Sequence, residues 1–225
     1  MSSKTVVIIG SNRGIGLALV QEYLKNNWTV FAVCRSLSTE LTTLMSNPNI
    51  RVLDGIDVTK SDDRTRLAQQ LPYSIEEIIH NAGILKRDDL SSIDESAMLE
   101  QFNVNAVAPL QTLLSLKPHL SSNARVGIIT SRMGSIGDCS GHSMLGYRVS
   151  KAAVNMIGKN LANAWRTEGI TVLLLHPGYV RTDMTGGNGL ISTTESAQGL
   201  YQRMREHGLN DTGTFWHTNG EAIEW

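Results

Sequence analysis

The chain has 225 residues, of which 41% are apolar and 18% charged, and its 20 basic and 21 acidic side chains leave a formal net charge of −1. At about 150 residues per domain, this length predicts a single domain over residues 1–225 with a sizeable core. A charge near zero, without a run of Lys or Arg, argues against nucleic acid or an anionic membrane surface as a partner. The longest apolar runs, 6–9 and 172–175, are far shorter than the ~20 residues of a membrane helix, so we expect no membrane span.

Neither the amino-terminal residues nor the cysteine pattern indicates an exported or metal-binding protein. Met1 to Thr5 are polar and run directly into an apolar strand, so we expect no secretory signal and predict a cytoplasmic protein. Cys34 and Cys139 lie far apart, without a CxxC or Cys/His spacing. We therefore expect two free thiols and no metal site.

Short β-rich runs alternate with longer amphipathic stretches along the chain. The expected strands are 6–9, 29–33, 50–53, 77–79, 126–130, 171–175 and 214–216. The expected helices are 15–25, 38–45, 62–71, 93–116, 147–166 and 194–205. Near-continuous apolar strands suit a parallel sheet that is covered on both faces, and the alternation supplies the crossover helices. The pattern therefore predicts a doubly wound α/β fold.

Two local signals refine the fourth expected helix. Ser92 followed three residues later by Glu95 is a capping-box pattern, which predicts a helix start near Ile93. Pro109 falls inside the same helix and has no N–H to donate to the carbonyl group four residues earlier. We therefore expect the helix to bend around Asn105.

The first expected strand is followed by a glycine-rich turn that consists of Gly10, Ser11, Asn12, Arg13, Gly14, Ile15 and Gly16. A turn from a strand into a helix presents free backbone N–H groups and the positive end of the helix dipole, and glycine lets a pyrophosphate approach the backbone. This context predicts a dinucleotide-binding turn, with an ordinary tight turn as the alternative. The spacing Gly-x-x-x-Gly-x-Gly has one more residue in its first gap than the common dinucleotide-binding fingerprint.

Further motifs lie at the ends of the expected strands and in the expected helices. They are, in chain order, Asn81-Ala82-Gly83, Asn105, Ser131 and the Tyr-x-x-x-Lys pair of Tyr147 and Lys151. Together with the glycine-rich turn, and in this order, these motifs resemble the short-chain dehydrogenase/reductase family over essentially the whole chain. The resemblance implies a Rossmann fold, with a seven-stranded, mostly parallel sheet in a three-layer αβα arrangement, and an oxidoreductase activity.

Two segments are similar, more narrowly, to the small carbonyl-reductase branch that includes the C-factor and sniffer proteins. They are Ser131-Arg132-Met133-Gly134-Ser135 and residues 220–225. Two positions depart from the family pattern: Ile9 replaces a Thr before the first glycine, and His80 replaces the first Asn of Asn-Asn-Ala-Gly. We expect neither replaced side chain to be essential for the chemistry.

Tyr147 and Lys151 are four residues apart on an expected helix, so their side chains share one face. A neighbouring ammonium favours tyrosinate, and lowering a phenol pKa from ~10 to ~7 requires about 4 kcal/mol. We expect Lys151, assisted by a positively charged oxidised nicotinamide, to supply this, so that Tyr147 acts as a general acid or base. An interfacial tyrosine beside a solvated lysine is the alternative.

The resemblance also implies a role for Asn105, whose backbone carbonyl would hold a water molecule that links Lys151 to solvent. A purely structural bend at Pro109 explains the presence of Asn105 in this helix nearly as well.

Ser131 directly follows an expected strand and would hydrogen-bond the substrate oxygen as that oxygen becomes alkoxide-like. Tyr147 lies 147 − 131 = 16 residues further on, several more than is usual in the family, so the intervening loop carries an insertion. The insertion makes Ser135, Ser140 and Ser143 competing candidates for this role. Ser131 is preferred because it adjoins the strand.

The end of the second expected strand indicates which cofactor is bound. An acidic residue about 20 positions after the glycines would bind the ribose 2′-hydroxyl of NAD, whereas a basic residue would accept a 2′-phosphate. Arg35 stands at this place, Arg13 supplies a second guanidinium, and Ser36 adds a hydroxyl donor. These residues predict NADP(H), with solvated surface arginines as the alternative. The resemblance implies further cofactor contacts from Asp57, Val58, Asn81, Ala82, Gly83, Tyr147, Lys151, Pro177, Gly178, Val180 and Thr182.

The segment that would close over the substrate is short, because only about a dozen residues, 182–193, separate the sixth strand exit from the next helix. The apolar side chains expected to line the pocket are Met133, Ile136, Met144, Leu145, Tyr179 and Met184, each of which could instead belong to the core. We therefore predict NADPH-dependent reduction of aldehydes or ketones with apolar substituents. The alternatives are an alcohol dehydrogenase acting in the oxidative direction and a non-catalytic NADP-binding regulatory protein.

The family resemblance also implies an oligomer. Helices corresponding to 93–116 and 147–166 commonly pair between subunits in this family, and the apolar stretch 152–164 is compatible with such packing. We expect a homodimer, with a homotetramer also open.

Overall fold

All seven expected strands form one sheet in the computed structural model, which describes residues 4–225. The strands are β1 (Thr5–Ile9), β2 (Thr29–Val33), β3 (Ile50–Leu53), β4 (Ile75–His80), β5 (Leu120–Ile129), β6 (Thr171–His176) and β7 (Thr214–His217). Their order is β3-β2-β1-β4-β5-β6-β7, and every neighbouring pair is parallel. The doubly wound Rossmann fold is therefore confirmed.

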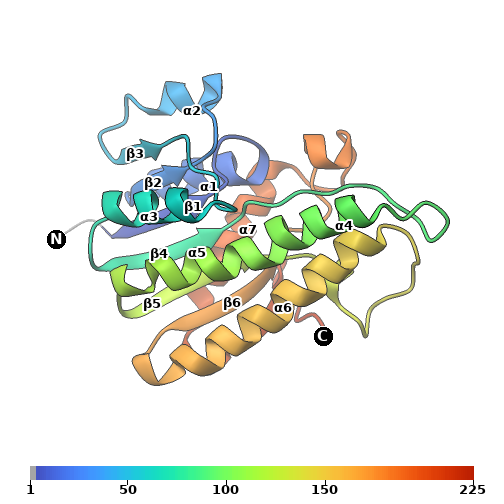
Figure 1. The fold of residues 1–225 in the computed structure, drawn as a ribbon. Helices are drawn as coiled ribbons and strands as arrows, with labels where there is room; N and C mark the ends of the chain where they lie inside the picture. Colours follow the sequence, from blue (N-terminus) through green and yellow to red (C-terminus); the bar gives the residue numbers. More distant parts are fainter. Residues whose placement is uncertain (1–3) are drawn as a thin grey trace.

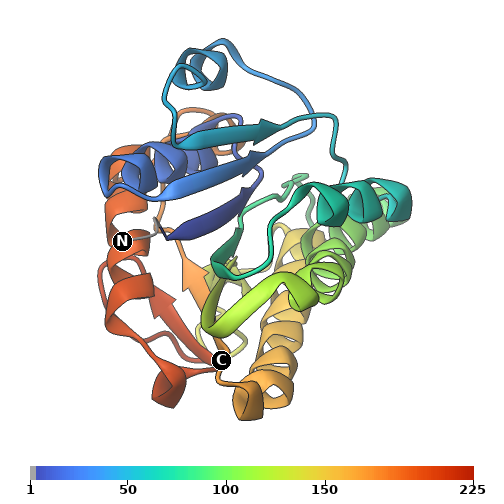
Figure 2. The ribbon, with the colours of Figure 1, turned by 90° about the vertical axis from the view of Figure 1, so that its left-hand side faces the viewer.

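Helices cover both faces of the sheet (Figure 1). They are α1 (Gly14–Lys25), α2 (Thr39–Leu44), α3 (Ser61–Gln70), α4 (Glu95–Phe102), α5 (Ala108–Leu116), α6 (Leu145–Trp165) and α7 (Thr193–Glu206). Figure 2 shows the sheet nearly edge-on, with α1 and α7 on one side and α3, α5 and α6 on the other. Alternate residues of β1 take part in the two cores: Val6 and Ile8 pack with α1 and α7, and Val7 with the opposite layer. Burial on both faces explains why the strands are apolar without interruption.

The helix expected over 93–116 is interrupted. A π-helical turn, Asn103–Val107, separates α4 from α5. Pro109 is the second residue of α5 and has no N–H for the Asn105 carbonyl, and the wider turn accommodates this missing hydrogen bond. The irregularity expected at Asn105 is thus confirmed, in the form of a π turn.

The capping-box prediction for this helix was wrong. The residue that caps α4 is Asp94, whose carboxylate accepts hydrogen bonds from the N–H groups of Ser96 at 2.9 Å and Ala97 at 3.3 Å. The Ser92 hydroxyl instead lies 3.4 Å from the Asp89 N–H, within the preceding turn. A carboxylate directly before the helix satisfies two free N–H groups at once, which the hydroxyl two residues earlier cannot do.

The loops that follow β4, β5 and β6 extend from the same end of the sheet, at the right of Figure 1. This arrangement follows from parallel strands, whose carboxyl ends meet at one edge, where open α/β sheets bind ligands.

No helix within residues 4–225 is long and apolar enough to cross a membrane. The two cysteines are free thiols as expected, Cys34 buried and Cys139 exposed.

Candidate active site

The glycine-rich turn after β1 packs closely against its neighbours. Gly10 has a φ of 84°, in the left-handed region that favours glycine. A Cβ on Gly10 would lie 2.7 Å from the Ala82 backbone nitrogen, and one on Gly16 would overlap the Gly10 carbonyl oxygen. Arg13, which precedes α1, makes no side-chain cap, and within residues 4–225 no side chain is seen to accept a hydrogen bond from the first N–H groups of α1. This shape and these donors fit a pyrophosphate.

Side chains around the turn hold it in place. The buried Ser11 hydroxyl donates to the Val33 carbonyl at 3.0 Å, and the Asn81 amide donates to the Gly10 carbonyl at 2.8 Å. The Ser38 hydroxyl donates to the Asn12 carbonyl at 2.6 Å, which brings the segment after β2 beside the turn. Ser11 and Asn81, both expected to bind cofactor, therefore use their side-chain donors to shape the turn.

The two arginines expected to bind a 2′-phosphate have different surroundings. The Arg13 guanidinium pairs with the Asp183 carboxylate at 3.1 Å, and both side chains are more than two-thirds exposed, at 71% and 79%. Arg35 is exposed, like Ser36 beside it, and makes no ion pair within residues 4–225. Arg35 therefore presents an uncommitted guanidinium at the end of β2, whereas Arg13 reaches toward the segment after β6.

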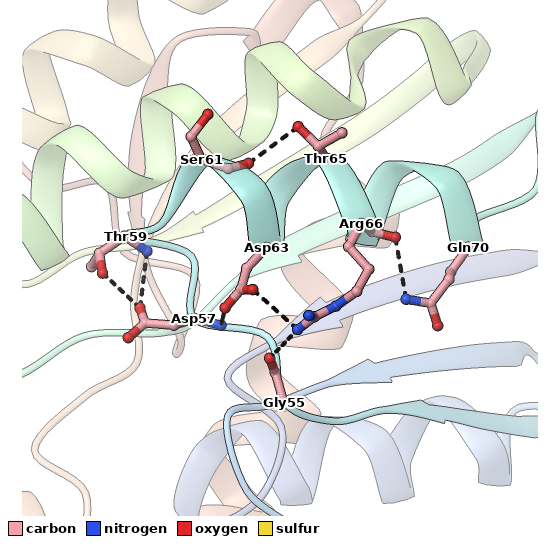
Figure 3. A network of polar contacts seen from close by, with 8 residues as sticks. All are labelled: Gly55, Asp57, Thr59, Ser61, Asp63, Thr65, Arg66 and Gln70. Atoms are coloured by element: carbon pink, nitrogen blue, oxygen red, sulfur yellow. Dashed lines mark hydrogen bonds and ion pairs between the residues drawn. The ribbon is translucent and has the colours of Figure 1, made fainter.

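Asp57 takes part in a polar network at the start of α3 (Figure 3). Its carboxylate oxygen Oδ1 accepts from the Thr59 N–H at 3.0 Å and from the Thr59 hydroxyl at 2.7 Å. The Asp57 N–H donates to the Asp63 carboxylate at 2.9 Å, and Asp63 also pairs with Arg66 at 3.1 Å. These contacts occupy one carboxylate oxygen of Asp57 and leave the other without a protein hydrogen bond among those observed. Val58, the other residue of the expected pair, is buried in the core.

Ser131, Tyr147 and Lys151 meet at the carboxyl end of β5, and all three are buried. Ser131 precedes a 3-10 turn, Arg132–Gly134, and its hydroxyl accepts from the Met133 N–H at 3.2 Å. A side-chain hydrogen bond links Ser131 to Tyr147. The Lys151 ammonium donates to the Ile129 carbonyl at 3.0 Å and lies 5.7 Å from the centroid of the Tyr147 ring. The structure thus brings together the three residues that the sequence selected.

The competing serines are placed differently. Ser135 is buried, and its hydroxyl accepts from the Asp138 N–H at 3.0 Å. Ser140 is exposed, and the Ser143 carbonyl accepts from the Arg148 guanidinium at 2.9 Å. Since the observed hydrogen bond to the Tyr147 hydroxyl comes from Ser131, the geometry favours Ser131.

The protein groups by themselves do not lower the Tyr147 pKa, so the lowering expected from Lys151 together with an oxidised nicotinamide stays a prediction. Burial raises the pKa of Tyr147 to about 12, although the hydrogen bond from Ser131 acts in the opposite direction. Burial also lowers the pKa of Lys151 to about 8. Desolvation outweighs the attraction because the ammonium is directed at the Ile129 carbonyl rather than at the phenolic oxygen.

Asn105 lies near Lys151, and its side chain holds the segment after β4 in place. Its amide oxygen accepts from the Ile84 N–H at 2.8 Å, and its amide nitrogen donates to the Ile84 carbonyl at 2.8 Å and to the Ser150 hydroxyl at 3.0 Å. A Cβ on Gly83 would lie 3.1 Å from the Asn105 amide oxygen and 3.6 Å from the Lys151 ammonium nitrogen. The segment 81–83 therefore passes close to both residues, and the role of the Asn105 backbone carbonyl stays a prediction.

The segment after β6 returns to the glycine-rich turn. The Pro177 carbonyl accepts from the Ser196 hydroxyl at 2.7 Å, and Gly178 has a φ of 88°. Val180 is buried and pairs with Ile191 in a short β-bridge. A Cβ on Gly14 would lie 3.6 Å from the Thr182 methyl group. These contacts place residues 177–182 across from the amino end of α1.

The side chains expected to contact substrate lie in the loops around Ser131 and Tyr147. Tyr179 and Met184 are exposed, and Met133 and Met144 are half-buried. A cavity of about 190 Å³ in this region contains none of the four: it is lined by Arg132, Gly137, Asp138, Ala222, Ile223 and Glu224. The cavity found within residues 4–225 therefore does not test the expected apolar wall of the substrate pocket, which stays a prediction.

Two residues near the site were not predicted from the sequence. Asn155 packs under the turn that carries Ser131, and its spacing of eight residues from Tyr147 was a usable signal, because it places both on one helix face. Asp88 accepts a hydrogen bond from the Gly146 N–H at 3.0 Å at the start of α6. No sequence signal joins Asp88 to α6, since the two are distant in the chain.

A protein-family model described as short chain dehydrogenase matches residues 4–190. The chain belongs to the short-chain dehydrogenase family. A curated member, 1-hydroxy-2-glutathionyl-2-methyl-3-butene dehydrogenase of Rhodococcus sp. (strain AD45), is 33% identical over 228 aligned residues, which cover 98% of this chain and 99% of the relative. This short-chain dehydrogenase is therefore an oxidoreductase by family.

Solved structures support the narrower placement of this short-chain dehydrogenase. The NADPH-bound carbonyl reductase from chicken fatty liver superimposes with a TM-score of 0.92 at 29% identity, and the alignment covers 100% of both chains. The carbonyl reductase Sniffer of D. melanogaster gives a TM-score of 0.93 at 25% identity, again with 100% of both chains covered. The resemblance to the carbonyl-reductase branch that the motifs indicated is confirmed.

Proposed function

We propose that the protein is an NADPH-dependent carbonyl reductase that acts on aldehydes and ketones with apolar substituents. The observation that carries this proposal is the buried group of Ser131, Tyr147 and Lys151, with the Ser131–Tyr147 hydrogen bond, beside the glycine-rich turn. The exposed Arg35 guanidinium, which makes no ion pair within residues 4–225, supports NADP(H) over NAD(H). Similar carbonyl reductases are described as NADPH-bound or in complex with NADP.

The residues present fit this cofactor. The backbone N–H groups of the turn 10–16 and the amino end of α1 would hold the pyrophosphate, and Arg35 would hold the 2′-phosphate. Residues 177–182 would contact the nicotinamide through backbone groups. When bound, NADPH supplies the hydride for the reduction.

The chain's own residues supply orientation and the proton. The hydroxyls of Ser131 and Tyr147 would donate hydrogen bonds to the carbonyl oxygen of the substrate, which orients it and stabilises negative charge on it. With its pKa raised to about 12, Tyr147 is a protonated phenol at neutral pH, the form a proton donor needs. With its pKa lowered to about 8, Lys151 keeps its charge at neutral pH and stabilises the tyrosinate left after proton transfer.

Substitution of Tyr147 by Phe tests this proposal. NADPH consumption with a panel of apolar aldehydes and ketones would be compared between the wild type and Tyr147→Phe, together with the dissociation constant of NADPH. Because general acid catalysis contributes roughly 100- to 10,000-fold, we expect Tyr147→Phe to lose at least about 100-fold in kcat/KM while binding NADPH as before. Equal rates in the two proteins would contradict the mechanism, and NADPH binding without turnover in the wild type would favour a regulatory protein.

A second candidate function is oxidation of an alcohol, because the Rhodococcus relative is named as a dehydrogenase. This direction requires Tyr147 as a base that accepts the proton of the alcohol. The same assay run with NADP and the corresponding alcohols distinguishes the two directions.

We further propose a homodimer in which α4, α5 and α6 of two copies face each other.

A further inference from the structure

Asn155 lies on the face of α6 that carries Tyr147 and Lys151, eight and four residues earlier. Its side chain is 3% exposed. Asparagine is a poor residue for a helix interior, and a buried amide is costly unless its donor and its acceptor are both paired. The partners of this amide therefore indicate what the residue does.

Both partners belong to the chain on either side of Ser131. The Thr130 hydroxyl donates to the Asn155 amide oxygen at 2.6 Å, and the Asn155 amide nitrogen donates to the Gly134 carbonyl at 3.1 Å. Thr130 directly precedes Ser131, and the Gly134 N–H donates to the Ser131 carbonyl at 2.8 Å to close the 3-10 turn. One buried amide thus ties down the two ends of the turn that presents the Ser131 hydroxyl.

The same turn rests directly on α6. A Cβ on Gly134 would lie 2.6 Å from the Lys151 carbonyl carbon, and the Thr130 hydroxyl also lies 3.5 Å from the Lys151 carbonyl oxygen. The turn is therefore in contact with the helix backbone at the residue next to Tyr147 on this face. A small movement of the turn changes the distance between the Ser131 and Tyr147 hydroxyls.

Other contacts of the turn are weaker anchors. Arg132 pairs with Asp138 at 3.0 Å and with Glu221 at 3.2 Å, and all three side chains are more than two-fifths exposed. Exposed ion pairs contribute roughly 0–1 kcal/mol and are screened by salt. Asn155 makes the buried side-chain contacts between α6 and both ends of the turn.

We propose that Asn155 is a positioning residue for carbonyl reduction: it fixes the turn 130–134 on α6 so that the Ser131 and Tyr147 hydroxyls converge on one substrate oxygen. This inference rests on the proposed function for its kinetic consequence. A misplacement of about 1 Å in a reacting group can cost roughly 100-fold in rate. Asn155 itself touches no substrate.

The first test is a double-mutant cycle with Ser131. Asn155→Ala is expected to lower kcat about 10- to 100-fold with little change in the dissociation constant of NADPH. In a Ser131→Ala background the same substitution is expected to lower kcat less than about threefold, because the group it positions is gone. Asn160→Ala is the matched control, since Asn160 is exposed on the same helix and its amide donates to the Met156 carbonyl at 2.9 Å. Equal losses in both backgrounds would overturn the proposal.

Thr130→Val provides a second route in case Asn155→Ala does not fold. It removes the hydroxyl that donates to Asn155 with little change of shape, and Thr130→Ser restores that donor. We expect Thr130→Val to lower kcat and Thr130→Ser to recover most of it. A loss of thermal stability in Thr130→Val with kcat unchanged would overturn the proposal.

A readout without turnover separates this inference from the proposed function. In protein labelled with ¹³C at the tyrosine Cζ, the Tyr147 resonance, assigned by its absence in Tyr147→Phe, reports the hydrogen bond from Ser131. We expect Asn155→Ala to shift this resonance in the same direction as Ser131→Ala, and Asn160→Ala to leave it in place. An unchanged resonance in Asn155→Ala would overturn the positioning role, whereas absence of wild-type turnover with the shift present would overturn only the proposed reaction.

Discussion

Tyr147 and Lys151 occupy one buried site, and burial moves their pKa values apart: the pKa of the Tyr147 phenol rises to about 12 and the pKa of the Lys151 ammonium falls to about 8. Burial disfavours the charged form of each group, so the phenol holds its proton more firmly and the ammonium less firmly. At neutral pH both groups are still protonated. Tyr147 is thus ready to donate a proton beside a cation, which suits reduction.

The buried ammonium of Lys151 predicts a pH-dependent stability. Below its lowered pKa of about 8, the folded protein contains a charge that the unfolded chain solvates better. Lys151→Met removes this cost, so we expect its free energy of unfolding to exceed that of the wild type by about 2 kcal/mol near pH 7. The difference should shrink as the pH rises from about 8 toward 10.5, because Lys151 of the folded protein is then neutral while the same lysine in the unfolded chain still holds its proton.

Urea unfolding of both proteins at about pH 7 and about pH 10 measures this difference. Lys25→Met, at the exposed end of α1, is the control for a general effect of removing a lysine. A gap between the Lys151→Met variant and the wild type that widens with rising pH would contradict the assignment of the cost to the buried ammonium.

Arg35 predicts the nucleotide preference. A hydrogen bond to a charged group contributes roughly 1.5–3 kcal/mol, so Arg35→Ala should raise the dissociation constant of NADPH about 10- to 100-fold. The dissociation constant of NADH should change little, because NADH lacks the 2′-phosphate. Calorimetric titration with both nucleotides measures this, with Arg51→Ala as the control, since the exposed Arg51 donates to the Pro48 and Ile50 carbonyls. Equal weakening of both nucleotides would rule out a 2′-phosphate contact.

At the scale of the elements, α6 carries most of the chemistry but begins without a cap of its own. Met144, before its first residue, has a left-handed φ of 57° and makes no side-chain cap. Asp88, in the segment after β4, supplies the missing acceptors: its carbonyl accepts from the Met144 N–H at 2.8 Å and its carboxylate from the Gly146 N–H at 3.0 Å. A carboxylate at this end also interacts favourably with the helix dipole. The start of α6, directly before Tyr147, is therefore fixed from another segment.

Removal of this remote cap predicts a loss of stability. Replacing a helix cap by alanine typically costs about 1 kcal/mol, so we expect Asp88→Ala to lower the free energy of unfolding by about that amount. Asp88→Asn should lose less, because its amide oxygen can still accept from the Gly146 N–H. Chemical unfolding of the three proteins measures the effect. If the asparagine variant were as unstable as the alanine variant, the carboxylate would act through its charge rather than as a cap.

At the scale of the whole molecule, buried polar groups also join the layers away from the active site. Glu77 of β4 is fully buried, accepts from the Tyr23 hydroxyl of α1 at 2.6 Å and pairs with Arg205 of α7. The Arg205 guanidinium also lies 4.8 Å from the centroid of the Trp28 ring. This cluster links α1 and α7 to the sheet in the amino-terminal half of β4, whereas the catalytic residues lie at the carboxyl ends. The molecule thus separates a structural polar cluster from a functional one.

The proposed dimer predicts that one face of the molecule is covered in solution. Figure 1 shows α4, α5 and α6 side by side, and Leu99 on α4 and Met156 on α6 are 60% and 64% exposed. Contiguous exposed apolar side chains commonly mark an interaction surface. We expect the wild type to sediment as a dimer and Met156→Glu as a monomer. Leu190→Glu, a matched change at an exposed leucine in the segment after β6, should stay dimeric. A monomeric wild type would contradict the proposal.

The expected strands agree closely with the observed ones, and 29–33 and 50–53 have the observed bounds of β2 and β3. Parallel strands buried on both faces leave uninterrupted apolar runs, which are visible without tertiary information. The helix cap at Asp94 was missed because Ser92 offered similar cap chemistry two residues earlier. Local chemistry identifies candidates for a cap, and packing selects among them.

The order of strands and helices, the family, and the group of Ser131, Tyr147 and Lys151 followed from the amino-acid sequence alone. Such features depend on neighbouring residues, on periodicity and on turns at strand ends, all of which are local in the chain. Only the tertiary structure decided the raised pKa of Tyr147, the cap from Asp88 and the contacts of Asn155. Each of these depends on burial or on contacts between distant segments, and neither quantity exists until the layers have packed together.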